Sequence, residues 1–271
     1  MTQEKNVPGF MLLNSVTERR CYLHSGLKDK GYPGLVSTTA IGVSSFEFMP
    51  ERALSRSVED YLKAIFGLSE GGESASTSDI AEALDVQPAS VTGMIKRLAT
   101  DGLLQHLPYR GVRLTDEGET AALKVLRRHR IVETYLCDRL NYSWDDVHAE
   151  AERLEHAASD ELVDRMAAAL GSPSHDPHGT PIPTRAGTIE AANLTTLADG
   201  APGDRVRIRA VRDEEAEELR SMAADGLVPG VALEIEPGQK TEGIVSVIVG
   251  GDPLAVKDHL AQRIYVVPDE A

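Results

Sequence analysis

The sequence predicts a mainly α-helical protein with a small β component: a winged helix-turn-helix, a helical dimerisation domain and a C-terminal β-barrel. Two short amphipathic segments joined by a tight turn and followed by two short strands predict the winged helix-turn-helix. A pair of longer helical segments comes next, and β-branched segments between Gly and Pro turns fill the C-terminal part. The expected parts are residues 1–52 (a poorly ordered extension), 53–118 (DNA-binding domain), 119–172 (helical dimerisation domain), 173–199 (linker) and 200–271 (barrel).

Length and composition favour a cytoplasmic protein with aliphatic cores. A chain of 271 residues is long enough for two or three domains, and 41% hydrophobic residues with only 4% aromatic ones predict aliphatic packing. Cys21 and Cys137 match no metal-binding or disulfide pattern, which favours a reducing compartment. The N-terminal residues lack the pattern of a secretory signal, and no apolar run reaches the length of a membrane span. We therefore expect a cytoplasmic protein without a membrane partner.

The distribution of charge predicts two different kinds of partner. The net charge of −15 argues against a protein that coats nucleic acid without specificity. Residues 90–130 nevertheless hold eight Lys or Arg against four acids, whereas residues 145–170 hold eight acids against two arginines. A basic segment followed by an acidic one suits contact with phosphate at one place and with cations at another. Taken alone, each run is explained more simply as a solvated helix face.

The helix-turn-helix is predicted between residues 57 and 98. A first helix begins at about Ser57, and Thr77 or Ser78 is expected to cap a short second helix. A tight turn then leads to Pro88 at the first position of the next helix, which buries an apolar face and leaves polar and basic side chains outside. We expect this outer face and the following wing to contact DNA. The candidate residues are Ser90, Thr92 and Lys96 in the major groove, and Arg97, Arg110 and Arg113 on phosphates.

Two helical segments, at about 116–140 and 144–170, follow the wing. The first carries the basic block and the second an acidic stripe that ends at Gly171-Ser172-Pro173. Such a pair commonly forms the dimer core of winged-helix regulators, so we expect a homodimer that binds two half-sites. Trp144 is expected to pack between the dimer helices, and His178 in the linker is interpreted as an ordinary loop residue.

The acidic segment contains a candidate metal-binding stripe. Glu152, Glu155 and His156 follow His148 at helical spacings, and residues at i, i+3 and i+4 share one face of a helix. Carboxylates and imidazoles arranged in this way suit a divalent cation that prefers oxygen and nitrogen donors. A solvated acidic face is the simpler alternative for this stripe alone.

The C-terminal segments predict a binding or regulatory module. DRVRIRAV, VALEIEP, IVSVIVGG and RIYVVP read as strands of a small β-barrel, and a short helix at about 214–224 interrupts them. This part holds no catalytic constellation, and the protein is not expected to be an enzyme.

The motifs along residues 55–267 together resemble the diphtheria toxin repressor and manganese transport regulator family of metal-dependent repressors. They are SVEDYLKAI, SDIAEALDVQPASVTGMIKRLATDGLL, RRHRIVE, VHAEAERLEH and HGTPIPT. Each is weak alone, whereas their order and spacing are specific. The resemblance implies that the C-terminal domain is SH3-like (FeoA-like). It also implies a regulator of metal-homeostasis genes that binds double-stranded operator DNA as a homodimer.

The resemblance implies two metal sites in the helical region. The residues at the positions of the family's first site are Asp60, Glu152, Glu155 and His156. Those at the positions of its second site are His129, Glu133 and His148, with Glu215 and Glu218 from the barrel as the residues that complete it.

The resemblance also implies a preference for Mn²⁺, with Fe²⁺ second. Asp60 and Glu152 stand where iron-responsive members carry methionine and cysteine, and hard Mn²⁺ favours carboxylates. Lys63 stands where short manganese regulators carry a glutamate, so two separated sites are expected rather than a close pair of ions. The alternatives are an iron-responsive member of the family, or a winged-helix regulator that answers to a non-metal ligand.

The arrangement of acids predicts a mechanism. Three carboxylates held together without a cation repel one another, so the empty first site should leave the N-terminal helix loose. Metal binding would then tether the DNA-binding domain to the dimer core and fix the spacing of two recognition helices.

Overall fold

We describe a computed structural model of the chain. It describes residues 54–69, 74–107, 109–190, 194–212, 215–237 and 243–269, all within one compact unit, Arg52–Ala271. The extension predicted at residues 1–52 lies outside these ranges. None of the helices in the described residues is long and apolar enough to cross a bilayer.

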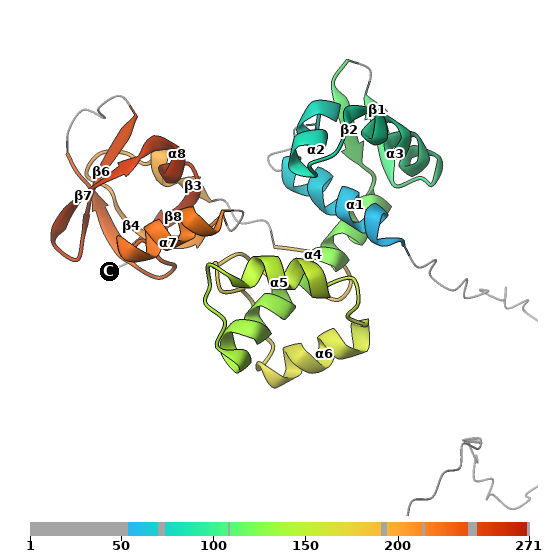
Figure 1. The fold of residues 1–271 in the computed structure, drawn as a ribbon. Coiled ribbons are helices and arrows are strands. Elements are labelled where there is room, and N and C mark those ends of the chain that lie inside the picture. The colour runs from blue at the N-terminus through green and yellow to red at the C-terminus, as the bar shows by residue number, and fades with distance from the viewer. Residues whose placement is uncertain are drawn as a thin grey trace, which may run out of the picture. The chain divides into compact units, whose positions relative to one another are not determined.

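The N-terminal part of the unit is a winged helix-turn-helix (Figure 1). It comprises α1 (Arg56–Leu68), α2 (Thr77–Ala83), α3 (Pro88–Thr100) and an antiparallel wing, β1 (Leu104–Leu107) with β2 (Gly111–Leu114). Pro88 occupies the first turn of α3 as predicted. Ser76, not Thr77 or Ser78, caps α2, because its side chain accepts a hydrogen bond from the Asp79 amide. The core of this part is mainly aliphatic, with Tyr61 as a buried aromatic residue, and includes the fully buried Leu62, Ile65, Ile80, Val91 and Leu98.

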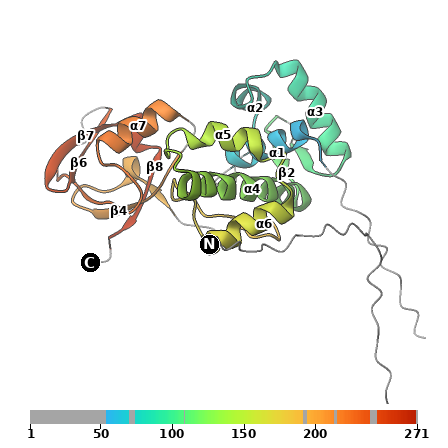
Figure 2. The same cartoon turned by 60° about the horizontal axis from the view of Figure 1, so that its bottom comes forward.

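Three helices follow the wing. They are α4 (Asp116–Leu140), α5 (Val147–Leu154) and α6 (Asp160–Ala169), and Figure 2 shows α4 running between α5 and α6. Helix α4 begins where Thr115 accepts a hydrogen bond from the Gly118 amide and ends at Asn141, which adopts the left-handed conformation. The continuous helical region predicted at 144–170 is wrong: Ser159 accepts from the Leu162 amide and caps a new helix, α6.

The C-terminal part is a six-stranded antiparallel sheet in the order β3-β8-β4-β5-β6-β7. Its strands are β3 (Thr195–Thr196), β4 (Arg205–Val211), β5 (Ala232–Ile235), β6 (Ile244–Val249), β7 (Asp252–Lys257) and β8 (Ile264–Pro268). The helices α7 (Ala216–Ala224) and α8 (Asp258–Ala261) and the 3-10 turn η1 (Leu197–Asp199) accompany them. Two differences from the expected barrel appear: β3 and η1 begin within the segment predicted as a linker, and β7 was not predicted.

Trp144 is partly buried and packs against the core of the sheet. Its ring lies 5.6 Å from that of His178, and its carbonyl oxygen lies 2.7 Å from His178 Nε2. His178 is fully buried, so the linker packs on the protein through it instead of running over the surface.

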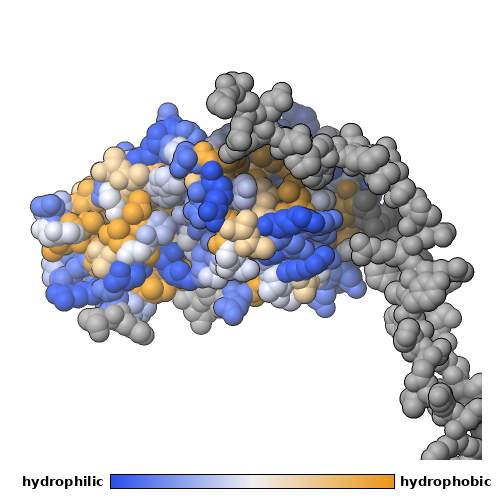
Figure 3. Space-filling model, turned by 90° about the horizontal axis from the view of Figure 1, so that it is seen from below, coloured by the Kyte–Doolittle hydropathy of each residue, from blue (hydrophilic) through white to orange (hydrophobic). Residues whose placement is uncertain are grey.

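The surface of the helical part carries several large apolar side chains. Figure 3 shows one face, on which hydrophobic and hydrophilic areas alternate. The large hydrophobic residues exposed in the region of α4, α5 and α6 are Leu140, Tyr142, Leu154 and Leu162.

Candidate metal centre

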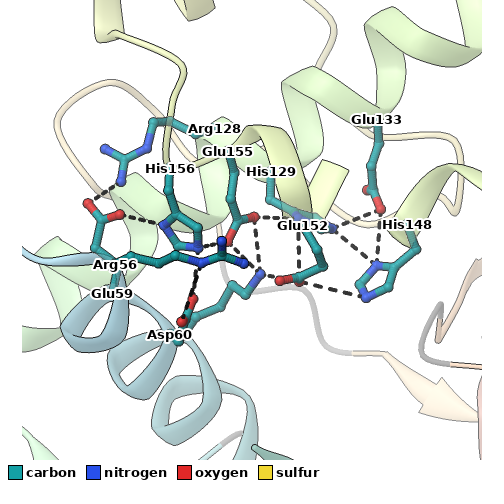
Figure 4. Close-up of polar contacts among 11 residues, drawn as sticks. Arg56, Glu59, Asp60, Arg128, His129, Glu133, His148, Glu152, Glu155 and His156 are labelled. Atoms are coloured by element: carbon teal, nitrogen blue, oxygen red, sulfur yellow. Dashed lines mark hydrogen bonds and ion pairs between the residues drawn. The ribbon is translucent and has the colours of Figure 1, made fainter. Parts of the chain in front are cut away.

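The first cluster consists of Asp60, Glu155 and His156, whose potential ligand atoms all lie within 4.8 Å of one another. Asp60 comes from α1, whereas Glu155 caps the C-terminus of α5 and His156 follows it. His156 Nε2 lies 2.7 Å from Asp60 Oδ1 and 3.2 Å from Glu155 Oε1, and Figure 4 shows the three side chains converging. Residues almost a hundred positions apart in sequence are thus brought into one potential ligand set, as predicted for these three positions.

A second carboxylate from α1 orients the imidazole of this cluster. Glu59 Oε2 lies 2.7 Å from His156 Nδ1, and the other oxygen of Glu59 accepts a hydrogen bond from Arg128 on α4. The second ring nitrogen, Nε2, consequently faces Asp60 and Glu155. A carboxylate on one nitrogen that fixes the direction of the other is the usual support of a histidine ligand. Sequence reasoning missed Glu59, although it directly precedes Asp60.

Lys63 occupies the space between Glu152 and Glu155. Its Nζ donates to Glu155 Oε1 and Oε2 at 2.9 and 3.1 Å, and also to Glu152 Oε1. Burial opposes the charge of this ammonium, but the two carboxylates outweigh it and raise the pKa of Lys63. The expected repulsion among empty carboxylates is therefore offset here by a charge of the chain itself.

The second cluster consists of His129, His148 and Glu152. Glu152 Oε1 lies 3.6 Å from His129 Nδ1 and 3.7 Å from His148 Nε2, so Glu152 turns toward this cluster rather than the first. Glu133 approaches from α4, one turn after His129, with Oε1 at 2.8 Å from His129 Nε2 and 3.2 Å from His148 Nδ1. The four residues thus form a continuous polar group (Figure 4).

His129 joins the first cluster to the second. Its Nδ1 lies 2.5 Å from Glu155 Oε2 while its Nε2 faces Glu133, and the ring is almost fully buried. Burial disfavours the imidazolium, yet the charge of Glu133 and the hydrogen bonds to Glu133 and Glu155 raise the pKa of His129 to about 9. Burial also opposes ionisation of Glu155, but His129 and Lys63 lower the pKa of its carboxyl group. His129 therefore links residues predicted for the first site to residues predicted for the second.

A third cluster, Glu133, Asp176 and His178, is entirely buried and was not predicted. His178 Nδ1 lies 3.9 Å from Glu133 Oε2, while Nε2 faces the Trp144 carbonyl oxygen. Because a carbonyl oxygen only accepts, Nε2 carries the proton, and in a neutral ring Nδ1 then offers its lone pair toward Glu133. This arrangement is chemically suited to a cation. The sequence signal was the HGTPIPT motif, but nothing local to it indicates that His178 is buried.

Glu215 and Glu218 lie elsewhere than predicted. Both are at the start of α7, and Glu218 Oε2 lies 2.8 Å from Arg263 Nη1. None of the potential ligand clusters found among the described residues contains either glutamate.

The predicted DNA-contacting residues lie on exposed surface of α3 and the wing. Ser90, Thr92, Lys96 and Arg97 are exposed on α3, and Arg110 and Arg113 are exposed at the wing. Arg97 Nε lies 3.8 Å from Asp101 Oδ2, an exposed pair that DNA phosphate can replace at small cost.

Comparison with known sequence families gives three consecutive matches. Residues 53–112 match the family described as "Iron dependent repressor, N-terminal DNA binding domain". Residues 115–184 match "Iron dependent repressor, metal binding and dimerisation domain", and residues 195–268 match the FeoA domain.

Individual relatives agree with these matches. The iron-dependent repressor IdeR of Mycobacterium tuberculosis is 31% identical over 225 residues, which cover 77% of this chain and 95% of the relative. The diphtheria toxin repressor of Corynebacterium diphtheriae is 29% identical over 219 residues, with coverages of 77% and 95%. Among solved structures, a manganese-dependent transcriptional repressor in complex with manganese has a TM-score of 0.73 at 37% identity, and covers 78% of this chain and 99% of its own.

Proposed function

Because the chain belongs to the iron-dependent repressor family, whose members are metal-dependent transcriptional repressors and not enzymes, we propose that a divalent cation in its metal centre controls the binding of a homodimer to operator DNA. The single observation that carries this proposal is the meeting of Asp60 from the DNA-binding part with Glu155 and His156 from the helical part. A cation bound here would contact both parts and could fix the position of the DNA-binding part relative to the helical part.

The donor atoms fit such an ion. The first cluster supplies two carboxylates and an imidazole, and Glu59 already holds the imidazole in a ligating orientation. The ammonium of Lys63, which donates to both Glu152 and Glu155, indicates that the site attracts a cation. In the second cluster, the candidate ligands are His129 and His148, together with Glu133 beside them, and Glu152 lies between this cluster and the first. The third cluster adds Asp176 and His178.

Mn²⁺ is the proposed physiological ion, with Fe²⁺ as the second choice. The three clusters contain only carboxylate and imidazole groups, and hard, weakly competing Mn²⁺ favours such donors over the thiolates and thioethers that softer ions prefer. The likeness to a manganese-dependent repressor at 37% identity supports the same choice. The iron-dependent repressor at 31% identity keeps Fe²⁺ as the competitor.

Two exposed surfaces support the proposed partners. The outer face of α3 presents Ser90, Thr92 and Lys96 for the major groove. The exposed apolar residues Leu140 and Leu162 of the helical part offer contact area for a second copy of the chain. A dimer is what two half-sites of an operator require.

Metal-dependent DNA binding tests the proposal. A DNA duplex selected by the protein from a random library in the presence of Mn²⁺ serves as the operator. We expect its affinity, measured by fluorescence anisotropy, to be about a hundredfold higher with saturating Mn²⁺ than with EDTA, and to recover when Mn²⁺ is restored. Equal affinity in EDTA and Mn²⁺ would show that no cation controls the repressor.

Because the pKa of His129 is raised, we predict that metal binding at this ring releases a proton. A metal ion needs the neutral imidazole, whereas the pKa of about 9 keeps this ring protonated at neutral pH. The affinity for Mn²⁺ should therefore rise with pH, by up to about tenfold per unit below pH 9. The stability of the metal-free fold should change with pH in the opposite direction. The raised pKa of His129 stabilises the fold below pH 6.5, and this contribution is lost as pH rises toward 9.

Calorimetry measures the proton directly. At pH 7, the apparent enthalpy of Mn²⁺ binding should vary between buffers of different ionisation enthalpy, with a slope of about one proton per ion bound at His129. An enthalpy independent of the buffer contradicts the prediction.

A further inference from the structure

Lys63 and the candidate metal ligands use the same oxygen atoms. The ammonium donates to both oxygens of Glu155, at 2.9 and 3.1 Å, and to Glu152 Oε1. Glu155 Oε1 also lies 3.2 Å from His156 Nε2 of the first cluster. The ammonium of Lys63 therefore contacts the same carboxylate oxygens of Glu155 that an ion would need.

The surroundings of Lys63 favour this position. Glu155 is fully buried, and the Lys63 side chain is only 19% exposed, so water screens the contact far less than at the surface. Lys63 lies one turn after Asp60 on α1, so its stem follows the same face of the helix as the predicted ligand. The alternative partners of Glu155 are His129 and His156.

We propose that Lys63 is an internal counter-cation that competes with the divalent ion for Glu152 and Glu155, and thereby raises the metal concentration at which the repressor becomes loaded. This inference rests on the proposed function. An ion that takes Glu155 as a ligand must displace the ammonium, because two cations so close to one carboxylate repel each other. Lys63 then turns to the partly exposed side of the site.

The same contact holds α1 against α5 when no metal is bound. Lys63 comes from the DNA-binding part and Glu152 from α5, so their ion pair crosses the junction that the metal ion would cross. Metal binding would therefore replace the ion pair of Lys63 with metal–ligand bonds across the same junction. In the metal-free protein, the ion pair keeps α1 more ordered than three unpaired carboxylates would.

Binding of Mn²⁺ to Lys63 variants tests the proposal. Lys63→Leu keeps an apolar stem and adds no ligand atom, and Lys63→Arg keeps the charge. By titration calorimetry, Lys63→Leu should bind Mn²⁺ at least about tenfold more tightly than the unaltered protein, and its metal-free form should melt at a lower temperature. Lys63→Arg should stay within about threefold of the unaltered affinity. Lys257→Leu, at an exposed position of β7, makes the same change in net charge and should leave the affinity unchanged.

A second measurement uses the unaltered chain and does not depend on how the variants fold. Amine acetylation followed by mass spectrometry should label Lys63 several times faster with Mn²⁺ than in EDTA, while the labelling of Lys257 stays constant. Unchanged or slower labelling of Lys63 would overturn the proposal, as would equal or weaker Mn²⁺ binding by a folded Lys63→Leu variant. If the unaltered protein binds no more Mn²⁺ than Glu155→Gln does, the metal site itself fails, and the competition fails with it.

Discussion

Glu155→Gln is expected to lower the Mn²⁺-dependent affinity for operator DNA by about a hundredfold, which corresponds to a loss of roughly 3 kcal/mol of coupling. The carboxylate of Glu155 is fully buried and contacts His129, His156 and Lys63. An amide of the same size keeps the packing but removes the charge that balances a cation. The measurement is fluorescence anisotropy with labelled operator, titrated with protein at saturating Mn²⁺ and again in EDTA.

A matched control separates the loss of the site from the loss of one acid. Glu161→Gln removes an exposed carboxylate of α6 that pairs only with its neighbour Arg165 among the described ion pairs, and should leave DNA binding within about twofold. Circular dichroism checks that both variants fold. If Glu155→Gln retains its full response to Mn²⁺, the first cluster is not the controlling site.

The sequence predicted which residues form the first cluster, but not how the side chains connect this cluster to the second. Asp60, Glu155 and His156 were placed by their motif positions, and the structure brings them together. The position of Glu152 depends on how its side chain turns between Lys63 and His129, which no motif records. The packing that brings α1 beside α5 is what makes Lys63 a counter-cation.

The third cluster shows a different limit. His178 lies in a segment rich in Gly and Pro, which is typical of a surface loop. It is buried because distant groups cover it: the Trp144 ring lies against its ring at a tilt, and the Val211 amide on β4 donates to its carbonyl oxygen. Such long-range packing leaves no periodic pattern in the local sequence.

Helix positions were predicted from their periodicity, and errors fell at the breaks. Helix α4 has the predicted bounds, Asp116–Leu140, because a threonine cap and an apolar stripe mark it. The interruption between α5 and α6 depends on whether Ser159 turns back to cap a helix or continues one, and both are possible for a serine. The strand β7 was missed because Pro253 stands at its start and suggests a turn.

Gly118→Ala is expected to destabilise the junction between the wing and α4 by about 3 kcal/mol, which would lower the melting temperature by roughly 5–10 °C. Gly118 is buried in the first turn of α4, where a Cβ atom would lie 1.9 Å from the carbonyl oxygen of Leu103. That oxygen cannot withdraw easily, because it accepts a hydrogen bond from the Thr115 amide at 3.1 Å. Backbone on both sides must therefore move, and the cap at Thr115 moves with it.

Gly93→Ala is the matched control for this substitution, and the comparison decides whether close packing or the loss of glycine itself is responsible. Gly93 lies within α3, where a Cβ atom would meet nothing within 4 Å. Alanine favours helix over glycine by about 1 kcal/mol, so this variant should melt at the same temperature or slightly higher. Differential scanning calorimetry of the metal-free proteins measures both. Equal melting temperatures for the two variants would mean that the backbone at Gly118 yields readily, and that the wing is not locked to the start of α4.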